Sequence, residues 1–501
     1  MRRQMALQLP LLALTATASL AASPAAQPPA SCPDYAEYSK TKHPPYSSGP
    51  LQLGYMRPEP QCRTFNSSDV GDILKDMEGA IANPDLYRFF HNAYPNTLDT
   101  AIRWHGVAAD NPDEELTFVI TGDIDAMWLR DSANQMQSYL PVLKPSDSKD
   151  SIASLFRGVI NLQARYLLAS PYCNSFQAPA ESAIPPAVNG AAKQDAVKPP
   201  YDNATVFECK YELDSLAAFL QVSSQYLDAT ADEGFFARFA WARAARAVLD
   251  TARAMTRPTY GEDGRVLENP YTFTRDTTRA TETLANDGAG SPVANGTGLV
   301  RSAFRPSDDS TIFQLLVPSN MMFSYYLRKA AGIATAVGEA ALAGEMTSLA
   351  EQIRDGIARH AVVRKGGPDG PKVFAFEVDG FGSAVVMDDA NVPSLLAAPF
   401  WEFDKGDFAE IYANTRRAVL DEDGPDGNPY FMRGPVLSAV GGPHVGPGKG
   451  WPMASVVRIL TSDDDGEITG VLGEVLRSTD GIGLMHESVD AFNASIWTRQ
   501  W

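Results

Sequence analysis

Apolar residues recur at every third or fourth position along much of the chain, a spacing that gives a helix one apolar face. Short runs rich in glycine, proline, serine and asparagine separate these stretches and mark turns and loops. The segments that this spacing predicts to be helical are residues 73–82, 84–102, 151–169, 211–227, 235–255, 319–337, 339–361, 407–420, 451–462 and 468–479.

The stretch 116–143 combines a strand pattern with a helix pattern. Its β-branched run, Leu116 to Thr121, predicts a strand that ends at Gly122. An amphipathic helix is predicted after it, with an apolar face made of Leu129, Ala133, Met136 and Leu140. The stretch therefore turns from strand to helix close to residue 128.

The order of these elements favours an all-α fold. The only other strand signal that we retain is a short hairpin over Lys372 to Asp379, and the βαβα alternation of a parallel sheet is missing. No boundary resembles an interdomain linker. We predict one large all-α domain over residues 61–501, built as a toroid of paired helices with minor β-hairpin insertions.

Two segments lack periodicity. Residues 23–60 are rich in proline, serine, alanine and tyrosine, and we expect an extended N-terminal segment that wraps over the surface. Residues 177–200 are rich in proline and alanine, and we expect a mobile loop there.

Composition excludes several functions. The 501 residues carry a net charge of −19, which argues against nucleic-acid binding because phosphate contacts need clustered Lys and Arg. The six histidines have no HxH or HExxH spacing, and neither a G-x-S-x-G elbow nor a Walker-type phosphate loop is found. We expect no metal and no cofactor, so carboxylates are the groups left to perform chemistry.

The N-terminus predicts entry into the secretory pathway. Arg2 and Arg3 precede an apolar run with small residues near Ala22, which is the pattern of a signal peptide over residues 1–22. Secretion is the favoured destination, with a Golgi-type signal anchor as the alternative, and no later segment predicts stable membrane insertion. We expect a monomer.

Cysteines and glycosylation sequons agree with this route. Four cysteines allow three pairings, and sequence proximity favours Cys32–Cys62 and Cys173–Cys209. Sequons that would accept N-linked glycans occur at Asn66, Asn203, Asn295 and Asn493.

Charged and aromatic residues gather at the predicted helix start. Asp125, Trp128, Arg130 and Asp131 lie within seven residues, together with apolar neighbours that imply a partly enclosed site. A solvated helix entry, with aspartates favoured by the helix dipole, is the alternative interpretation. A polar cup with an aromatic wall is suited to a sugar ring.

Two carboxylates are candidates for acid–base chemistry. Asp214 lies near the start of a predicted helix among aromatic residues, which can raise the pKa of a carboxyl as a general acid requires. Glu487 follows apolar residues and glycines in GIGLMHES. The alternatives are an ordinary N-terminal helix acid for Asp214 and a capping or ion-paired glutamate for Glu487.

Further polar segments could complete the same pocket. FRPSDDS places Arg305 beside Asp308 and Asp309, which predicts either a local salt bridge or a carboxylate–guanidinium pair shaped for vicinal hydroxyls. A glycine-rich loop carries His444 close to Trp451, which could stack on a sugar or cover the core.

The motifs TGDIDAMWLRDSANQ, KYELDSL, FRPSDDS, PSNMMF, MDDANVPSLL, GGPHVGPGKGWP and LMHES, in this order, resemble glycoside hydrolase family 125, the exo-α-1,6-mannosidases. The resemblance runs from about Val70 to the end of the chain. It implies an (α/α)6 barrel and metal-independent hydrolysis, with inversion, of terminal α-1,6-linked mannose from N-glycan-like or mannan oligosaccharides.

The resemblance also implies residue roles. Asp214 matches the general acid and Glu487 the general base, which in an inverting enzyme lie about 6.5–9.5 Å apart. The substrate contacts that we expect are Asp125, Trp128, Arg130, Asp131, Arg305, Asp308, Asp309, Asn320, His444 and Trp451.

Alternatives remain open at this point. The family continues after its base motif into a tryptophan-rich helix, so we expect the domain to be clipped at its C-terminus, where the chain reads NASIWTRQW. An exo-glycosidase with another sugar or linkage, a catalytically silent mannose-binding protein and a calcium-dependent mannosidase using Asp123 and Asp125 are the rival functions.

Overall fold

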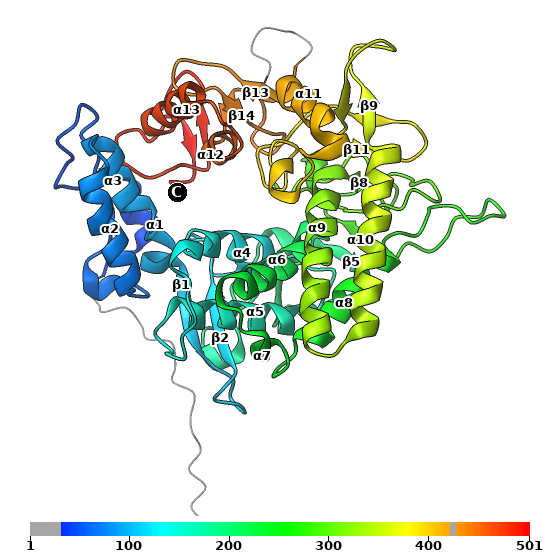
Figure 1. Cartoon of the computed structure of the whole chain (residues 1–501), viewed down its shortest axis with the longest axis horizontal. Helices are drawn as coiled ribbons and strands as arrows, with labels where there is room; N and C mark the ends of the chain where they lie inside the picture. The colour runs from blue at the N-terminus through cyan, green and yellow to red at the C-terminus, as the bar shows by residue number, and fades with distance from the viewer. Residues whose placement is uncertain (1–31, 421–426, 501) are drawn as a thin grey trace, which may run out of the picture.

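Paired helices arranged in a ring form most of the molecule, as the computed structural model of residues 32–420 and 427–500 shows (Figure 1). The predicted signal peptide, residues 1–22, lies outside these described residues. The helices are α1 Tyr35–Tyr38, α2 Ser68–Ala80, α3 Pro84–Ala93, α4 Leu129–Gln137, α5 Ile152–Ala169, α6 Leu213–Thr230, α7 Glu233–Phe236, α8 Trp241–Ala254, α9 Val317–Ala336, α10 Ala340–His360, α11 Ala409–Leu420, α12 Pro452–Leu460 and α13 Asp465–Arg477.

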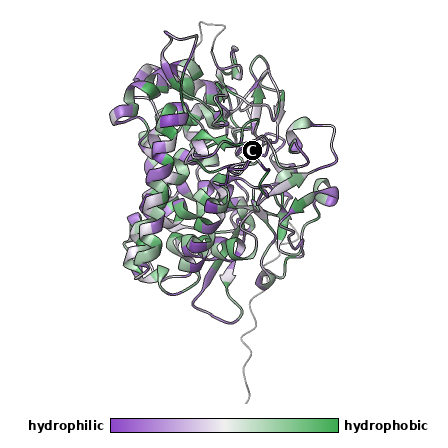
Figure 2. Ribbon diagram, turned by 90° about the vertical axis from the view of Figure 1, so that its right-hand side faces the viewer, coloured by the Kyte–Doolittle hydropathy of each residue, from purple (hydrophilic) through white to green (hydrophobic). Residues whose placement is uncertain are grey.

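The chain passes once around the ring (Figure 1). Helix α4 packs on α6, α6 on α9 and α9 on α10, while α5 packs on α8 and α12 on α13. The early helix α3 contacts the late helix α13, which closes the ring. Hydrophobic and hydrophilic residues mix along the helices, as expected where only one face is buried (Figure 2). The predicted all-α fold, a ring of paired helices, is confirmed.

Helix α5 shows how sequence determines this packing. Ser151 caps its N-terminus by accepting a hydrogen bond from the Ser154 N–H, and almost every residue of the helix is buried. The helix lies on β2 (Glu115–Val119), which pairs antiparallel with β1 (Ile102–Val107). The strand predicted from Leu116 is therefore confirmed.

The helix predicted over residues 84–102 is wrong in its second half. Helix α3 ends at Ala93, a π-helical turn covers Thr97–Ala101, and β1 begins at Ile102. The strand β1, which begins at the last residue of the predicted helix, pairs with β2. The helical spacing of residues 84–102 did not reveal this partner.

Three small antiparallel sheets lie where helices begin. Their strand orders are β3–β4–β6, β12–β11–β8 and β15–β16–β17. Strand β3 runs directly into α4 and β8 into α9, and β15 is followed one residue later by α12. Their strands are β3 Met127–Trp128, β4 Ser175–Phe176, β6 Val206–Glu208, β8 Leu315–Leu316, β11 Glu377–Val378, β12 Ala384–Val385, β15 Lys449–Gly450, β16 Ser488–Asp490 and β17 Trp497–Thr498.

The hairpin predicted over residues 372–379 is corrected. Strand β10 (Lys372–Phe374) pairs with β9 (Val362–Arg364), whereas β11 pairs with β8 and β12. One short segment therefore belongs to two sheets, because its neighbours bring in separate partners. The remaining pairs are β5 Ala196–Lys198 with β7 Thr272–Thr274, and β13 Phe431–Met432 with β14 Ala439–Val440.

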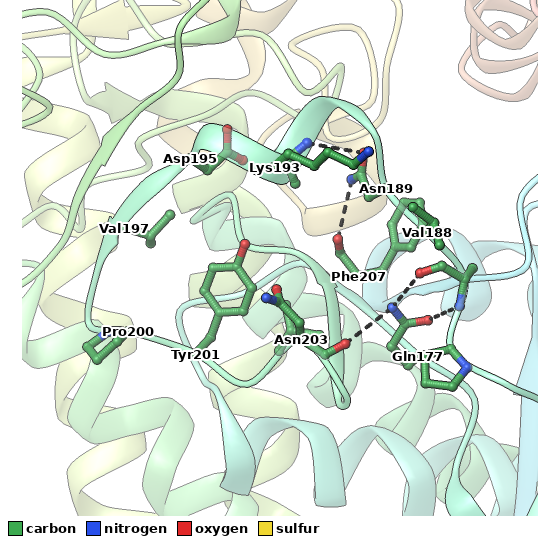
Figure 3. A pocket seen from close by; sticks show the side chains of 14 residues that line it. Gln177, Val188, Asn189, Lys193, Asp195, Val197, Pro200, Tyr201, Asn203 and Phe207 are labelled. Carbon is green, nitrogen blue, oxygen red and sulfur yellow. Dashed lines mark hydrogen bonds between the residues drawn. The ribbon is translucent and has the colours of Figure 1, made fainter.

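The insertion predicted as a mobile loop is folded on itself. The amide of Gln177 donates to the Ala187 and Asn203 carbonyls and accepts from the Ala187 N–H. The insertion surrounds a hollow of about 550 Å³ (Figure 3). Arg275 ties the insertion to β6 because it pairs with both Asp195 and Glu208 at 2.7 Å.

Both favoured disulfides, Cys32–Cys62 and Cys173–Cys209, are confirmed. The first belongs to the N-terminal segment, which lies along α3 and is held by Asn92, whose amide donates to the carbonyls of Gly54 and Gly483. Among the residues described, no helix combines the length and apolarity that crossing a bilayer requires.

The last described segment, up to residue 500, forms a short strand where we expected part of a helix, and clipping of the domain at its C-terminus stays a prediction. Asp490 accepts hydrogen bonds from the N–H groups of Phe492 and Asn493, which forms a turn between β16 and β17. The segment NASIWTR therefore returns as a strand beside the base motif.

Two glycines test this packing. In Gly158→Ala the new methyl group on α5 would meet the Thr117 side chain and backbone of β2, so we expect a loss of about 1–3 kcal/mol in unfolding free energy. In the control Gly344→Ala, on an exposed part of α10 with open space around it, helix propensity should raise stability by about 0.5–1 kcal/mol. Urea unfolding followed by circular dichroism measures both, and shifts in the same direction would contradict the packing.

Candidate active site

One buried guanidinium gathers three carboxylates at the start of α4 and α6. Arg130, in the first turn of α4, lies 3.0 Å from Asp131, 3.1 Å from Asp214 and 3.9 Å from Glu212. Asp214 lies in the first turn of α6, and Glu212 caps it. The predicted clustering of Arg130, Asp131 and Asp214 is therefore confirmed by these contacts.

Asp214 has the environment of a protonatable acid. Its side chain is fully buried, and the Ser319 hydroxyl of α9 donates to it at 3.3 Å. Burial raises the pKa of Asp214 to about 6, even though Arg130 and the Ser319 hydrogen bond act in the opposite direction. This carboxyl can therefore hold or release a proton near neutral pH.

Glu212 and Asp308 form a second carboxylate pair. The Asn174 amide donates to Glu212 at 3.0 Å and to Asp308 at 3.2 Å. Burial and the neighbouring charge of Asp308 raise the pKa of Glu212 well above its usual range. The pKa of Asp308 is lowered, because Lys210 and Arg130 outweigh the opposing effect of burial. Of the two carboxyls, these surroundings favour the proton on Glu212.

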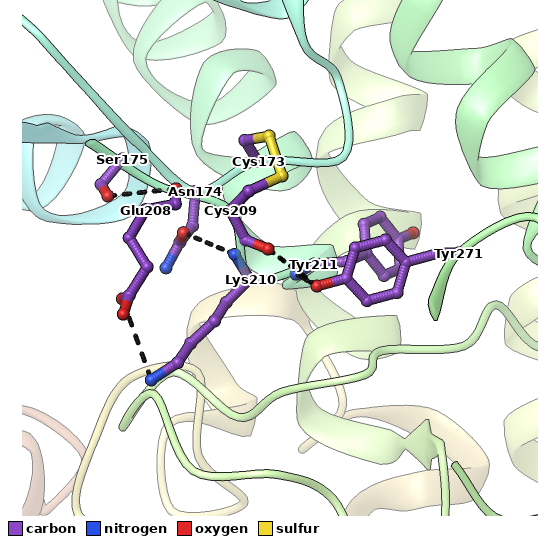
Figure 4. The surroundings of a disulfide bond; sticks show 8 residues. All are labelled: Cys173, Asn174, Ser175, Glu208, Cys209, Lys210, Tyr211 and Tyr271. Atoms are coloured by element: carbon purple, nitrogen blue, oxygen red, sulfur yellow. Dashed lines mark hydrogen bonds and ion pairs between the residues drawn. A yellow bond between two sulfur atoms is a disulfide. The ribbon is translucent and has the colours of Figure 1, made fainter. Parts of the chain in front are cut away.

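The Cys173–Cys209 disulfide joins the two segments that carry Asn174 and Lys210 (Figure 4). Asn174 follows the first cysteine and Lys210 the second, and the Lys210 N–H donates to the Asn174 side chain at 3.1 Å. Tyr271 supports the same turn, since its hydroxyl donates to the Cys209 carbonyl at 2.8 Å. The disulfide therefore fixes the two segments that hold Glu212 and Asp308.

His444 and Asp309 form another wall of the site. The His444 Nδ1 lies 3.5 Å from Asp309, and the rings of His444 and Trp451 are 6.2 Å apart. The hydrogen bond with Asp309 raises the pKa of His444 despite its burial, and the charges of Asp308 and Glu487 act in the same direction. These electrostatic contacts place Glu487, Asp308 and Asp309 around one imidazole.

Glu487 is more accessible than Asp214, with its side chain 22% exposed against a fully buried Asp214. It lies just before β16, and its Oε2 is 3.5 Å from the Arg499 Nε. Arg499 also donates to both carboxylate oxygens of Asp123, at 2.9 and 3.0 Å. Water can therefore reach Glu487, while a cation stays beside it.

Two tryptophans complete the enclosure. Trp128 is 7% exposed and Trp451 is 4% exposed. Among the residues that the structure describes, neither indole N–H has a hydrogen-bond partner. Trp128 packs edge-on against Phe207, which also lines the hollow of the insertion. The two indole N–H groups are donors that a polar ligand could satisfy.

Three predicted substrate contacts have other partners. Asp125 pairs with Arg103 of β1 at 2.9 Å. Arg305 pairs with Glu377 of β11 at 2.6 Å rather than with Asp308 or Asp309, which corrects both versions of the predicted local pair. Asn320 accepts from the Val300 N–H and donates to the Val300 and Leu316 carbonyls, so backbone groups engage its amide.

The proposed calcium cluster lacks the required arrangement. Asp123 and Asp125 are each paired with an arginine, Arg499 and Arg103 respectively. Within residues 32–420 and 427–500, no three His, Cys, Asp or Glu side chains converge as metal ligands do.

Sequence reasoning missed several residues of this site. Asn174 and Arg499 lie outside the quoted motifs, whereas Lys210 begins KYELDSL and Ser319 lies in PSNMMF without having been singled out. The position of Asn174 and Lys210 next to paired cysteines was a further signal that could have suggested them. Arg499 reaches Asp123 across 376 residues of sequence, a separation over which local patterns carry no information.

Comparison with known proteins identifies relatives over most of the chain. A family model described as metal-independent α-mannosidase, glycoside hydrolase family 125, matches residues 83–501. The meiotically up-regulated gene 157 protein of Schizosaccharomyces pombe is 45% identical over 471 residues, which are 94% of this chain and 89% of that protein.

A solved structure gives the same relationship. It is a metal-independent α-mannosidase of Streptococcus pneumoniae in a non-productive complex with α-1,6-mannobiose, at 33% identity and a TM-score of 0.74. The match covers 87% of this chain and 95% of that one. The ring of helices is therefore the (α/α)6 barrel that the sequence resemblance implied.

The two disulfides should differ in their effect on the site. Replacing Cys173 and Cys209 by serine should lower stability by about 2–4 kcal/mol. It should also lower kcat on an α-mannoside by about tenfold or more, because Asn174 and Lys210 lose their anchor. The matched control, Cys32→Ser with Cys62→Ser, should destabilise the fold with kcat nearly unchanged. Equal kcat losses in both double variants would contradict the proposed anchoring.

Proposed function

The chain belongs to glycoside hydrolase family 125, the metal-independent α-mannosidases, and from this premise we propose that it removes terminal non-reducing mannose from α-1,6 linkages with inversion. The observation that carries the proposal is the pairing of a buried acid, Asp214, with a more exposed one, Glu487. The first has its pKa raised to about 6 by burial, and water can reach the second.

In this mechanism Asp214 is the general acid. Its proton passes to the glycosidic oxygen as the bond from that oxygen to the anomeric carbon breaks. A general acid must be protonated at the working pH and yet able to release its proton, which a carboxyl with a pKa of about 6 satisfies. Arg130 stabilises the carboxylate that remains.

Glu487 is the general base. It takes a proton from the water that attacks the opposite face of the anomeric carbon, so one water is consumed and β-mannose is released. Its accessibility to solvent and its Arg499 partner support this assignment. The neighbouring pair Glu212 and Asp308 supplies carboxyl oxygens for hydroxyls, and the proton is favoured on Glu212.

The sugar contacts that we propose follow the walls of the site. Arg130 with Asp131, Asp308 and the Asp309–His444 pair would bind hydroxyls, and Trp128 and Trp451 would provide aromatic surfaces and indole donors. Asn320, Arg305 and Asp125 take supporting roles instead, because backbone or charged groups already engage them.

The expected substrates are N-glycan-like or mannan oligosaccharides. Two disulfides support a secretory setting. The asparagines of all four sequons, Asn66, Asn203, Asn295 and Asn493, are exposed, as glycosylation in that pathway requires. We propose a secreted monomer, with a signal anchor as the alternative.

Linkage and stereochemistry can be measured together. With EDTA present, we expect hydrolysis of α-1,6-mannobiose and no hydrolysis of the α-1,2 or α-1,3 isomers. Proton NMR of the first product should show β-mannose. Initial α-mannose would contradict the acid–base assignment, release from another isomer would indicate a different linkage specificity, and binding without release would identify a silent mannose-binding protein.

Asp214→Asn and Glu487→Gln should each lower kcat by about 10²–10⁴-fold, since each removes one proton-transfer partner. Both amides are near-isosteric, so mannobiose should still bind, as calorimetry can measure. A variant that keeps its kcat would remove that residue from the mechanism.

The pH profile should report Asp214 directly. Because Asp214 must be protonated to act, kcat/KM should fall as pH rises through about 6. The Ser319 hydrogen bond lowers the pKa of Asp214, so Ser319→Ala should move this basic limb to higher pH. A limb that stays in place in Ser319→Ala would assign it to another group.

A further inference from the structure

The end of the described chain is tightly held at the rim of the site. Strand β17 pairs with β16 in antiparallel register, and the Trp497 ring stacks on His486 at 4.4 Å and 2°. On the other side of Arg499, the Gln500 carbonyl contacts the His486 Nδ1 at 3.0 Å. The Gln500 side chain donates to the Ala36 carbonyl at 2.8 Å. The contacts on both sides of residue 499 therefore leave its backbone little freedom.

Arg499 itself has a backbone φ of +50°, in the left-handed region that residues other than glycine rarely adopt. Such a conformation persists where neighbouring contacts enforce it, as those of Trp497 and Gln500 do here. The conformation directs a long, positively charged side chain to two carboxylates from distant parts of the chain.

These two carboxylates are Asp123 and Glu487. The Arg499 Nη1 donates to both Asp123 oxygens, and the Nε lies 3.5 Å from Glu487. Asp123 lies in the loop that leads into β3 and α4, which carries Arg130. The Arg499 guanidinium thus links the loop that leads into β3 and α4 to Glu487, the proposed base.

We propose that Arg499 is a positioning residue that sets the orientation of Glu487, with Asp123 as its anchor. The proposal rests on the proposed function of Glu487 as the base. The proposal adds a residue close to Glu487 in sequence and far from the motif that carries Asp214.

Stability is not the purpose that this geometry suggests. The Arg499 side chain is 43% exposed and Asp123 is 31% exposed, and exposed ion pairs contribute little to folding. Orientation matters more, since a small displacement of a catalytic group can cost about 10²-fold in rate. Because the guanidinium is planar, the contact of the Arg499 Nη1 with Asp123 also limits the direction of the Nε–H that lies near Glu487. A lysine side chain cannot provide this geometry.

The test compares Arg499→Gln, Arg499→Lys and Asp123→Asn with a matched control, Arg328→Gln. Arg328 forms a similarly exposed pair with Glu402 at 2.8 Å on the outer surface, and no step of the mechanism uses it. We expect Arg499→Gln to lower kcat about 10–100-fold with KM little changed. Its melting temperature should match that of Arg328→Gln.

The other two variants separate charge from geometry. Arg499→Lys keeps the positive charge but not the planar guanidinium, so it should recover only part of kcat. Asp123→Asn should lower kcat in the same direction as Arg499→Gln, and the double variant should be no worse than Arg499→Gln alone. If Arg499→Gln fails to fold, Asp123→Asn, which keeps the guanidinium, provides the test.

Failure of this proposal can be told apart from failure of the proposed function. If Glu487→Gln is inactive while Arg499→Gln and Asp123→Asn behave like Arg328→Gln, the positioning role is overturned and the base assignment stands. If Glu487→Gln stays active, the base assignment itself fails. A change in Arg499→Gln that affects only KM, with kcat unchanged, also overturns the positioning role.

Discussion

The burial of several carboxylates around one guanidinium is the constraint on which the site depends. Removing charged groups from water is costly unless they are paired, and Arg130 compensates Asp131, Asp214 and Glu212 together. One cation cannot neutralise three anions, so the pKa values of these acids are forced upward: burial raises those of Asp131, Asp214 and Glu212. An excess of buried acid over base is thus what makes proton transfer near neutral pH available. A better balanced cluster would be more stable and chemically inert.

The fold supplies this constraint by directing helix starts to one place. The short sheets position Arg130 at the start of α4, Asp214 at the start of α6 and Ser319 at the start of α9. The Cys173–Cys209 disulfide and Tyr271 then hold the turn that carries Lys210 and faces Asn174 (Figure 4). The helices give the wall its stability, while strands of two or three residues determine where the polar groups point.

The sequence predicted the helices well because their apolar faces are local patterns. Helix α5 is predicted within one residue at its N-terminus and ends at the predicted residue, Ala169. It failed where tertiary pairing decides, as in β1 after α3 and in β17, where a helix was expected. The structure brings together site residues from different motifs, such as Arg130 and Asp214. Arg305 and Asn320 were assigned to substrate, although Glu377 and the backbone engage them. A motif indicates that a residue has a role, and the residue's partners in the structure indicate which role it is.

The roles that we propose for Asp214 as acid and Glu487 as base follow from how each side chain is covered. Asp214 is sealed beneath α6 and α9, where its proton can be controlled by burial, and water would interfere with transfer to a glycosidic oxygen. Glu487 has to meet water, so it lies at the rim, where burial cannot fix its orientation. A rim residue needs another means of positioning, and the arginine at 499 is the group in contact with it. The same reasoning explains why this contact joins segments 376 residues apart: the acid is positioned by the helices that bury it, whereas the base depends on the closure of the ring.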